Sequence, residues 1–171
     1  MKRKALSLTE CILAVLSVIM ILVMDMFAAS LTMLGQQIST GVTCKLFEVS
    51  NEAAPFASAG ILAPLNVIGV VLIVTLVLTA LFAFFKSGIV ANEKIEKLAG
   101  QKIMIIFPIV SLILTFLFMF MSAKFDASGM TLSFTPEMSF FLLIVLLIGA
   151  LVCNILGIKA SKGNTEGSTD I

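Results

Sequence analysis

Long apolar runs that hold almost no charge dominate this sequence. Four of them, each 20 to 25 residues long, cover residues 11–33, 61–85, 103–123 and 139–158, and Asp25 is their only charged residue. About 20 apolar residues, at about 1.5 Å each, cross the roughly 30 Å hydrocarbon core of a bilayer. With 60% hydrophobic and 12% charged residues, the chain lies far from the composition of soluble domains. The sequence therefore predicts an integral membrane protein, and it excludes a water-soluble enzyme, a nucleic-acid binder and a disordered chain.

Basic residues in the connections predict the orientation of the chain, because Lys and Arg are retained on the cytoplasmic side. Of the 11 Lys and Arg residues, nine precede the first run, lie between the second and third, or follow the fourth. Only Lys45 and Lys124 lie in the other two connections. We therefore expect both termini in the cytoplasm, with residues 34–60 and 124–138 outside. The short Lys-rich start and the lack of Trp, Tyr and His favour a prokaryotic inner or plasma membrane.

The predicted fold class is an all-α membrane protein, an antiparallel bundle of four transmembrane helices that forms one domain over residues 1–158. Residues 159–171 lack apolar anchors and are expected to form a disordered cytoplasmic tail. Small and polar residues recur at steps of three and four in each run, which is the spacing of a left-handed bundle with crossing angles of about 20°. The expected helix-packing positions are Gly69, Gly149, Cys153 and Gly157.

These stripes also predict which face of each helix points inward. In the first run the inward residues are Ala14, Ser17, Ile21, Asp25, Ala28 and Thr32. In the second run they are Asn66, Gly69, Ile73, Leu76, Ala80 and Ala83. In the third run they are Pro108, Ser111, Thr115, Phe118 and Ser122, and in the fourth Leu142, Leu146, Gly149, Cys153 and Gly157. Leu16, Val23 and Phe27 are expected to face lipid.

The first run is expected to be an uncleaved signal anchor. Two alternatives involve cleavage: a secretory signal peptide, which is normally shorter, and a leader that resembles those of type IV pilin-like proteins, with Ala5 before the cut and Glu10 fifth after it. A pilin has one such helix, whereas this chain has four apolar runs.

Two segments of the outer connections have the composition of strands. Residues 41–49 are rich in β-branched and aromatic side chains, and residues 130–135 alternate between polar and apolar. They form either a small extracellular sheet above the helices or irregular loops. The first alternative resembles the tetraspan architecture of claudin-type proteins. The Trp and paired Cys of that family's first outer loop are missing, so we do not assign the chain to it.

Asp25 is the candidate for an intramembrane site, because an ionisable group deep in a span costs about 2.5 to 3.5 kcal/mol on insertion scales. Measured from the outer ends of the runs, Asp25, Asn66 and Thr115 lie at similar depths of about 8 to 12 Å. They are predicted to form a polar cluster. Such a cluster is either an interhelical hydrogen bond that fixes helix register or a proton or cation site. Glu10 and Asn154 form a second pair near the cytoplasmic interface, interpreted as packing and capping.

The remaining chemistry is sparse. Cys11, Cys44 and Cys153 are spread over different compartments, so no intramolecular disulfide is expected, and Cys44 is predicted to be an exposed or partly packed thiol. The absence of His removes the common catalytic dyads and histidine metal ligands. We expect no catalytic residues, no metal site and no cofactor.

Two functional hypotheses follow. The first is a non-enzymatic scaffold, assembly factor or accessory subunit that packs against itself or against other membrane proteins. The second is a small transporter or channel subunit that uses Asp25 as a proton or cation site. The expected partners are the lipid bilayer and other membrane proteins or further copies of the chain, with no nucleic acid.

Overall fold

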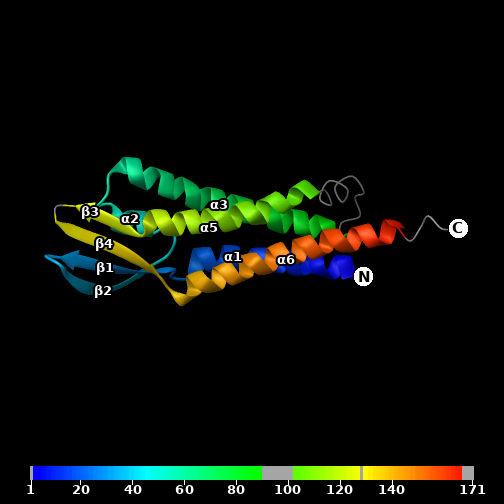
Figure 1. Cartoon of the computed structure of the whole chain (residues 1–171), viewed down its shortest axis with the longest axis horizontal. Helices are drawn as coiled ribbons and strands as arrows, with labels where there is room; N and C mark the ends of the chain where they lie inside the picture. Colours follow the sequence, from blue (N-terminus) through cyan, green and yellow to red (C-terminus); the bar gives the residue numbers. More distant parts are fainter. Residues whose placement is uncertain (1, 90–101, 128, 167–171) are drawn as a thin grey trace. The chain divides into compact units, whose positions relative to one another are not determined.

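The computed structural model describes residues 2–89, 102–127 and 129–166, which form helices and one antiparallel sheet (Figure 1). In chain order the elements are α1 (Lys2–Val23), β1 (Phe27–Met33), β2 (Gln36–Cys44), α2 (Val49–Ala53), α3 (Ala59–Lys86), the 3-10 helix η1 (Lys102–Ile105), α5 (Ile106–Ser122), β3 (Lys124–Ala127), β4 (Met130–Pro136) and α6 (Met138–Glu166). The chain divides into two compact units. Unit 1 contains Met1–Ser17, Val74–Leu112 and Val145–Ile171, and unit 2 contains Val18–Ile73 and Ile113–Ile144.

The predicted all-α bundle of four transmembrane helices is wrong, because the fold is mixed α/β. A four-stranded antiparallel sheet has the strand order β2-β1-β4-β3 (Figure 1). The main error lies in the first apolar run, where α1 ends at Val23 and the residues after Asp25 form β1. Hydropathy alone cannot distinguish such a buried strand from the continuation of a helix. Of the two alternatives for the outer segments, the sheet is the observed one: residues 130–135 lie in β4. In the segment 41–49 only residues 41–44 are strand, as the end of β2, and the rest forms the turn into α2 and the first residue of that helix.

Three helices are long and apolar enough to cross a membrane, which supports membrane association. They are Lys4–Val23 in α1, Ala59–Lys86 in α3 and Met138–Ala160 in α6. The fourth predicted span corresponds to α5, which is apolar but has only 17 residues. The side on which the termini lie stays a prediction. At the C-terminus, α6 extends to Glu166, beyond the predicted start of the tail, and residues 167–171 lie outside the described part of the chain.

Unit 2 is organised around the apolar face of its sheet. Side chains alternate along a strand, so Phe27 and Ala29 of β1 share a face with Phe134 and Leu132 of β4, and all four are at most 5% exposed. The ring of Phe27 lies 5.9 Å from that of Phe118 and 5.2 Å from that of Phe140, which lie on α5 and α6. Phe27 thus joins the sheet to two helices, although the sequence placed it against lipid.

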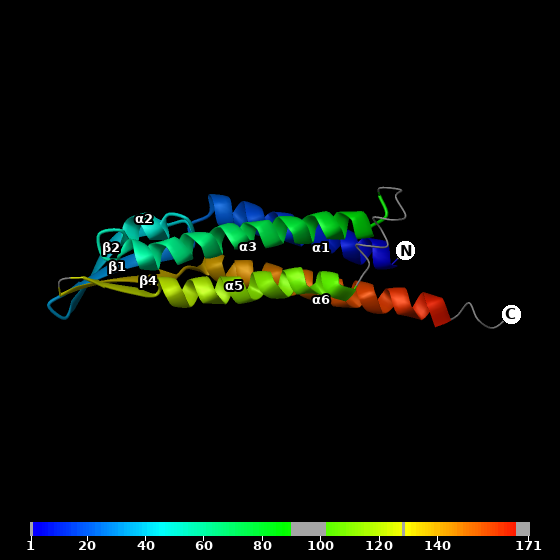
Figure 2. The same cartoon turned by 90° about the horizontal axis from the view of Figure 1, so that it is seen from above.

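The connection between β2 and α3 completes unit 2. It contains α2, and Figure 2 shows it next to the first part of α3. Close contact occurs at Gly69, where an added Cβ would lie 2.9 Å from the ring of Phe47 and 3.1 Å from Leu46. Cβ atoms essentially never approach side chains so closely, so this glycine allows the connection to pack on α3.

The described part of unit 1 is helical apart from the three residues that follow α3. The buried face of α1 contains Ser7, Glu10, Ala14 and Ser17, at steps of three and four residues and at most 1% exposed. The inward positions predicted at 14, 17 and 21 are therefore confirmed, as are all five of those predicted for α5, whereas Asp25 is exposed and Ala28 and Thr32 are only partly buried. In α6 the buried face is shifted by one position over most of its length, to Leu143, Leu147, Ala150 and Asn154, while Gly157 is buried as predicted.

Replacing Phe27 by Ala should lower the free energy of unfolding by about 3 to 5 kcal/mol, the usual cost of emptying a buried Phe site. The matched control is Phe120→Ala, since Phe120 is 72% exposed and should change stability little. Denaturant titration in detergent micelles measures both variants. Equal losses would contradict the position of Phe27 in the core of unit 2.

Candidate functional site

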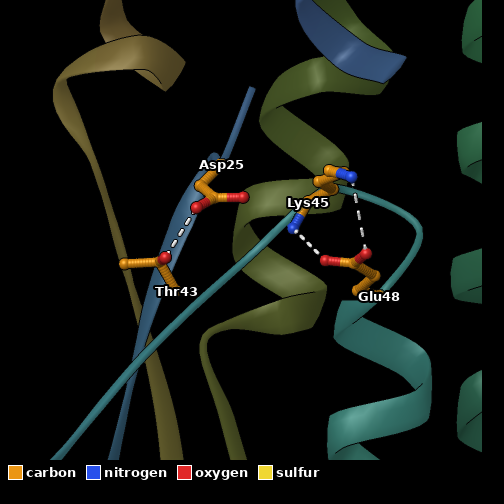
Figure 3. A network of polar contacts seen from close by, with 4 residues as sticks. All are labelled: Asp25, Thr43, Lys45 and Glu48. Carbon is orange, nitrogen blue, oxygen red and sulfur yellow. Dashed lines mark hydrogen bonds and ion pairs between the residues drawn. The ribbon is translucent and has the colours of Figure 1, made fainter. Parts of the chain in front are cut away.

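Asp25 lies in the short connection after α1, and its side chain is exposed. Its carboxylate Oδ2 accepts a hydrogen bond from Thr43 Oγ1 at 2.6 Å (Figure 3). Its backbone carbonyl accepts a hydrogen bond from the hydroxyl of Ser139. Of the other two residues in the predicted cluster, Asn66 is exposed on α3 and Thr115 is fully buried on α5. The hydrogen bonds described for Asp25 thus come from β2 and α6, and its clustering with Asn66 and Thr115 stays a prediction.

A second polar contact shown in Figure 3 stabilises the turn that leads into α2. The backbone N–H of Lys45 donates to Glu48 Oε2 at 2.9 Å, and Lys45 Nζ lies 3.8 Å from Glu48 Oε1. The two side chains are 41% and 47% exposed. Exposed ion pairs of this kind contribute at most about 1 kcal/mol, so Lys45 and Glu48 shape the local turn and do not form a reactive site.

Cys44, the last residue of β2, is only 1% exposed, so the expectation of an exposed or partly packed thiol is wrong. Burial, with smaller contributions from the negative charges of Glu52, Glu48 and Asp25, raises the pKa of the Cys44 thiol to about 12. Because the thiolate is the nucleophilic form, Cys44 stays protonated and unreactive near neutral pH. It is therefore unsuited to forming a disulfide with another chain.

The most costly polar arrangement in the described residues is a buried cluster in unit 1. Glu10 of α1 and Lys86, the last residue of α3, form an ion pair with 3.7 Å between Oε2 and Nζ, and their side chains are 2% and 4% exposed. Asn154 of α6 donates from Nδ2 to Glu10 Oε1 at 2.5 Å. The predicted pairing of Glu10 with Asn154 is confirmed, and the structure adds Lys86 to it. Three helices thus meet at one carboxylate.

The cluster has limited room and incomplete hydrogen bonding. Glu10 Oε2 and Asn154 Oδ1 are buried without a hydrogen-bond partner among the described residues. An added Cβ at Gly157 would lie 3.3 Å from Lys86 Nζ, so a glycine on α6 provides the space for the ammonium group. Buried polar atoms normally have partners, and each orphaned oxygen makes this cluster a candidate for function.

The other predicted packing positions lie in different surroundings. An added Cβ at Gly149 would lie 3.2 Å from Leu13, so α1 and α6 approach each other closely there. Cys153 is partly exposed, and its neighbour Asn154 lies on the buried face instead. No group of three or more Cys, Asp or Glu residues that could hold a metal ion occurs in the described ranges.

Sequence reasoning missed Lys86 as a site residue because it was counted with the basic residues that determine orientation. The signal was present in the spacing of α3, where the buried positions Leu72, Leu76, Thr79 and Ala83 recur at steps of three and four. Lys86 follows Ala83 by three residues and therefore continues this buried face. In the same way, Glu10 precedes the buried Ala14 by four residues and continues the buried face of α1.

Comparison of the chain with protein-family models, with curated proteins and with solved structures gives no match.

Lys86→Met should lower the free energy of unfolding by about 3 to 5 kcal/mol, because it leaves the buried carboxylate of Glu10 without its counter-charge. The double variant Glu10→Gln/Lys86→Met should recover most of that loss, since both charges are then gone. Lys45→Met, which breaks the exposed ion pair, is the control and should cost less than about 1 kcal/mol. Denaturant titration in detergent micelles measures all three. A double variant less stable than Lys86→Met would contradict a charge-pairing role.

Proposed function

We propose that this protein is a non-enzymatic membrane scaffold or accessory subunit that packs against other membrane proteins or against further copies of itself. The observation that carries the proposal is that the polar groups inside the helical segments bond to one another. The cluster of Glu10, Lys86 and Asn154 ties three helices together in unit 1. The hydroxyl of Ser111 on α5 donates to Thr75 on α3 at 2.9 Å. Side chains used in this way stabilise a framework.

The outward faces of the helices support the same proposal. They present large apolar side chains at helical spacing, such as Val67, Val70, Val74 and Val77 on α3, which are 41% to 60% exposed. Lipid tails cover such faces, and so do the helices of a partner protein. A framework whose interior polar side chains contact one another across helices and whose outer faces are apolar is suited to lateral association in the bilayer.

Site-specific photo-cross-linking in native membranes tests the proposal. A photoreactive amino acid at Val67 or Val145, which are 60% and 62% exposed, should give discrete protein adducts of reproducible mass. The same group at Leu143, which is fully buried, is the matched control and should react only within the chain. Adducts with lipid alone from both exposed positions would overturn the proposal.

The buried ion pair favours a second candidate, a small transporter or channel subunit. The earlier hypothesis placed a proton or cation site at Asp25, which is exposed next to Thr43. Glu10 has the environment expected of an intramembrane functional carboxylate, namely burial, a neighbouring ammonium group and an oxygen without a hydrogen-bond partner. A transport function would therefore act through Glu10 and Lys86.

Flux measurements with purified protein in liposomes test this second candidate. Transport of protons or monovalent cations should be lost in Glu10→Gln, which keeps the shape of the side chain and removes its charge. Asp25→Asn is the comparison variant and should transport normally. If the unmodified protein shows no flux above that of protein-free liposomes, the transport function is ruled out and the scaffold remains.

A further inference from the structure

The second face of the sheet in unit 2 is rich in hydroxyl groups. β1 pairs with β4 so that Ser30 lies opposite Ser133 and Thr32 opposite Thr131. β3 places Lys124 beside Ser133, and β2 places Gln37 beside Thr32. Because successive side chains of a strand point to opposite faces, these groups lie together on the face opposite Phe27 and Phe134.

A cavity of about 500 Å³ lies on this polar face. All four strands contribute to its lining, which consists of Thr32, Gln37, Lys124, Thr131, Ser133, Phe134 and Thr135, together with Ala123 just before β3. The volume falls within the range of about 300 to 1,000 Å³ that is typical of small-ligand sites. The register of the sheet therefore brings residues from four separate segments of the chain together around one cavity.

Internal hydrogen bonds hold much of this lining in place. Ser30 and Ser133 are joined through their hydroxyls at 3.0 Å, and Gln37 Nε2 donates to Ser30 Oγ at 3.1 Å. Thr131 donates to Asp126 Oδ1 at 2.5 Å. These bonds fix the orientation of the side chains before any ligand arrives, which lowers the entropic cost of binding.

Lys124 gives the cavity its charge. No carboxylate among the described residues lies within ion-pair distance of its ammonium group, in contrast to Lys45 and Lys86, which are paired with Glu48 and Glu10. Asp126 lies two residues along β3 on the same face and accepts a hydrogen bond from Thr131, a hydroxyl that carries no counter-charge. Lys124 is therefore the one charged residue in the cavity lining, and the carboxylate of Asp126 lies beside that lining at Thr131.

We propose that this cavity binds an acidic saccharide, a sugar unit that carries a carboxylate. The carboxylate lies against Lys124 in a charge-assisted hydrogen bond. The sugar hydroxyls donate to the hydroxyl oxygens of Thr131 and Thr135, whose own hydrogens are already donated within the sheet, and they exchange hydrogen bonds with Thr32 and with the side-chain amide of Gln37. Threonine also contributes a methyl group, which matches the C–H surface of a sugar ring. A cationic ligand is disfavoured by Lys124, and an apolar one would remove water from the hydrogen-bonding positions that the internal bonds of the lining leave open.

Binding of glucuronate to the full-length protein in detergent micelles tests this proposal. Isothermal titration calorimetry should show saturable binding of glucuronate, with glucose as the matched uncharged sugar and acetate as the matched carboxylate, both binding at least about tenfold more weakly. Lys124→Met should weaken glucuronate binding about tenfold or more, and Lys124→Arg should restore it. Thr32→Val, which keeps the β-branched shape, should weaken it about threefold.

The controls separate a local effect from loss of the fold. Lys45→Met removes a cation of the same unit that lies outside the cavity and should leave the affinity unchanged. If Lys124→Met does not unfold cooperatively, it is not correctly folded, and the affinities of Thr32→Val and Lys124→Arg are compared with that of the unmodified protein instead. If glucose and glucuronate bind with equal affinity, Lys124 does not recognise the carboxylate. If acetate and glucuronate bind with equal affinity, the cavity is a simple anion site. If no ligand shows saturable binding, this face of the sheet binds only water. Each of these outcomes overturns the proposal.

Discussion

The hydrogen bonds of β1 to both of its neighbours are the interaction on which unit 2 depends. β1 pairs with β2, which follows it directly, and with β4, which is about 100 residues away in sequence. This register sets which side chains share a face, because a strand's side chains alternate. A slip of one residue would expose Phe27 and bury Ser30 and Thr32 without partners. The same pairing therefore fixes the apolar core and the polar cavity of this unit.

Unit 1 depends on a different constraint, the burial of two opposite charges among apolar helices. The attraction between Glu10 and Lys86 offsets the cost of removing both groups from water only in part, so such a pair adds little net stability compared with apolar residues. What it contributes is specificity. The carboxylate must meet an ammonium group from α3 and an amide from α6 at once, and few relative positions of these helices satisfy that requirement. Gly157 is part of the same arrangement, since a side chain there would crowd Lys86.

The apolar runs were sufficient to predict α3, α5 and α6 and most of α1, whereas alternation indicated the segment of β4 but left an irregular loop as the alternative. The interior of α5 was also predictable, because small and polar residues at its buried positions stand out among Ile, Leu and Phe. β1 was not predictable from hydropathy, since a central strand buried by partners has the same composition as a helix end. The register between β1 and β2 shifts between Ala29 and Ser30. This irregularity further weakens the alternation of polar and apolar side chains by which β2 could have been predicted. Whether such a segment forms a strand or a helix end depends on pairing partners that are far away in the sequence.

The contrast between Asp25 and Glu10 shows why a charge in an apolar run is an ambiguous signal. A carboxylate inside hydrocarbon costs about 2.5 to 3.5 kcal/mol on insertion scales, and a chain can avoid that cost or share it. At Asp25 the carboxylate is kept out of the protein interior, because α1 ends at Val23 and the side chain lies exposed beside Thr43. At Glu10 the cost is shared with Lys86, which stands at the end of its own apolar run. A charged residue at the end of an apolar run can therefore be among the most buried charges of the protein. This happens when its position continues the inward face of the helix.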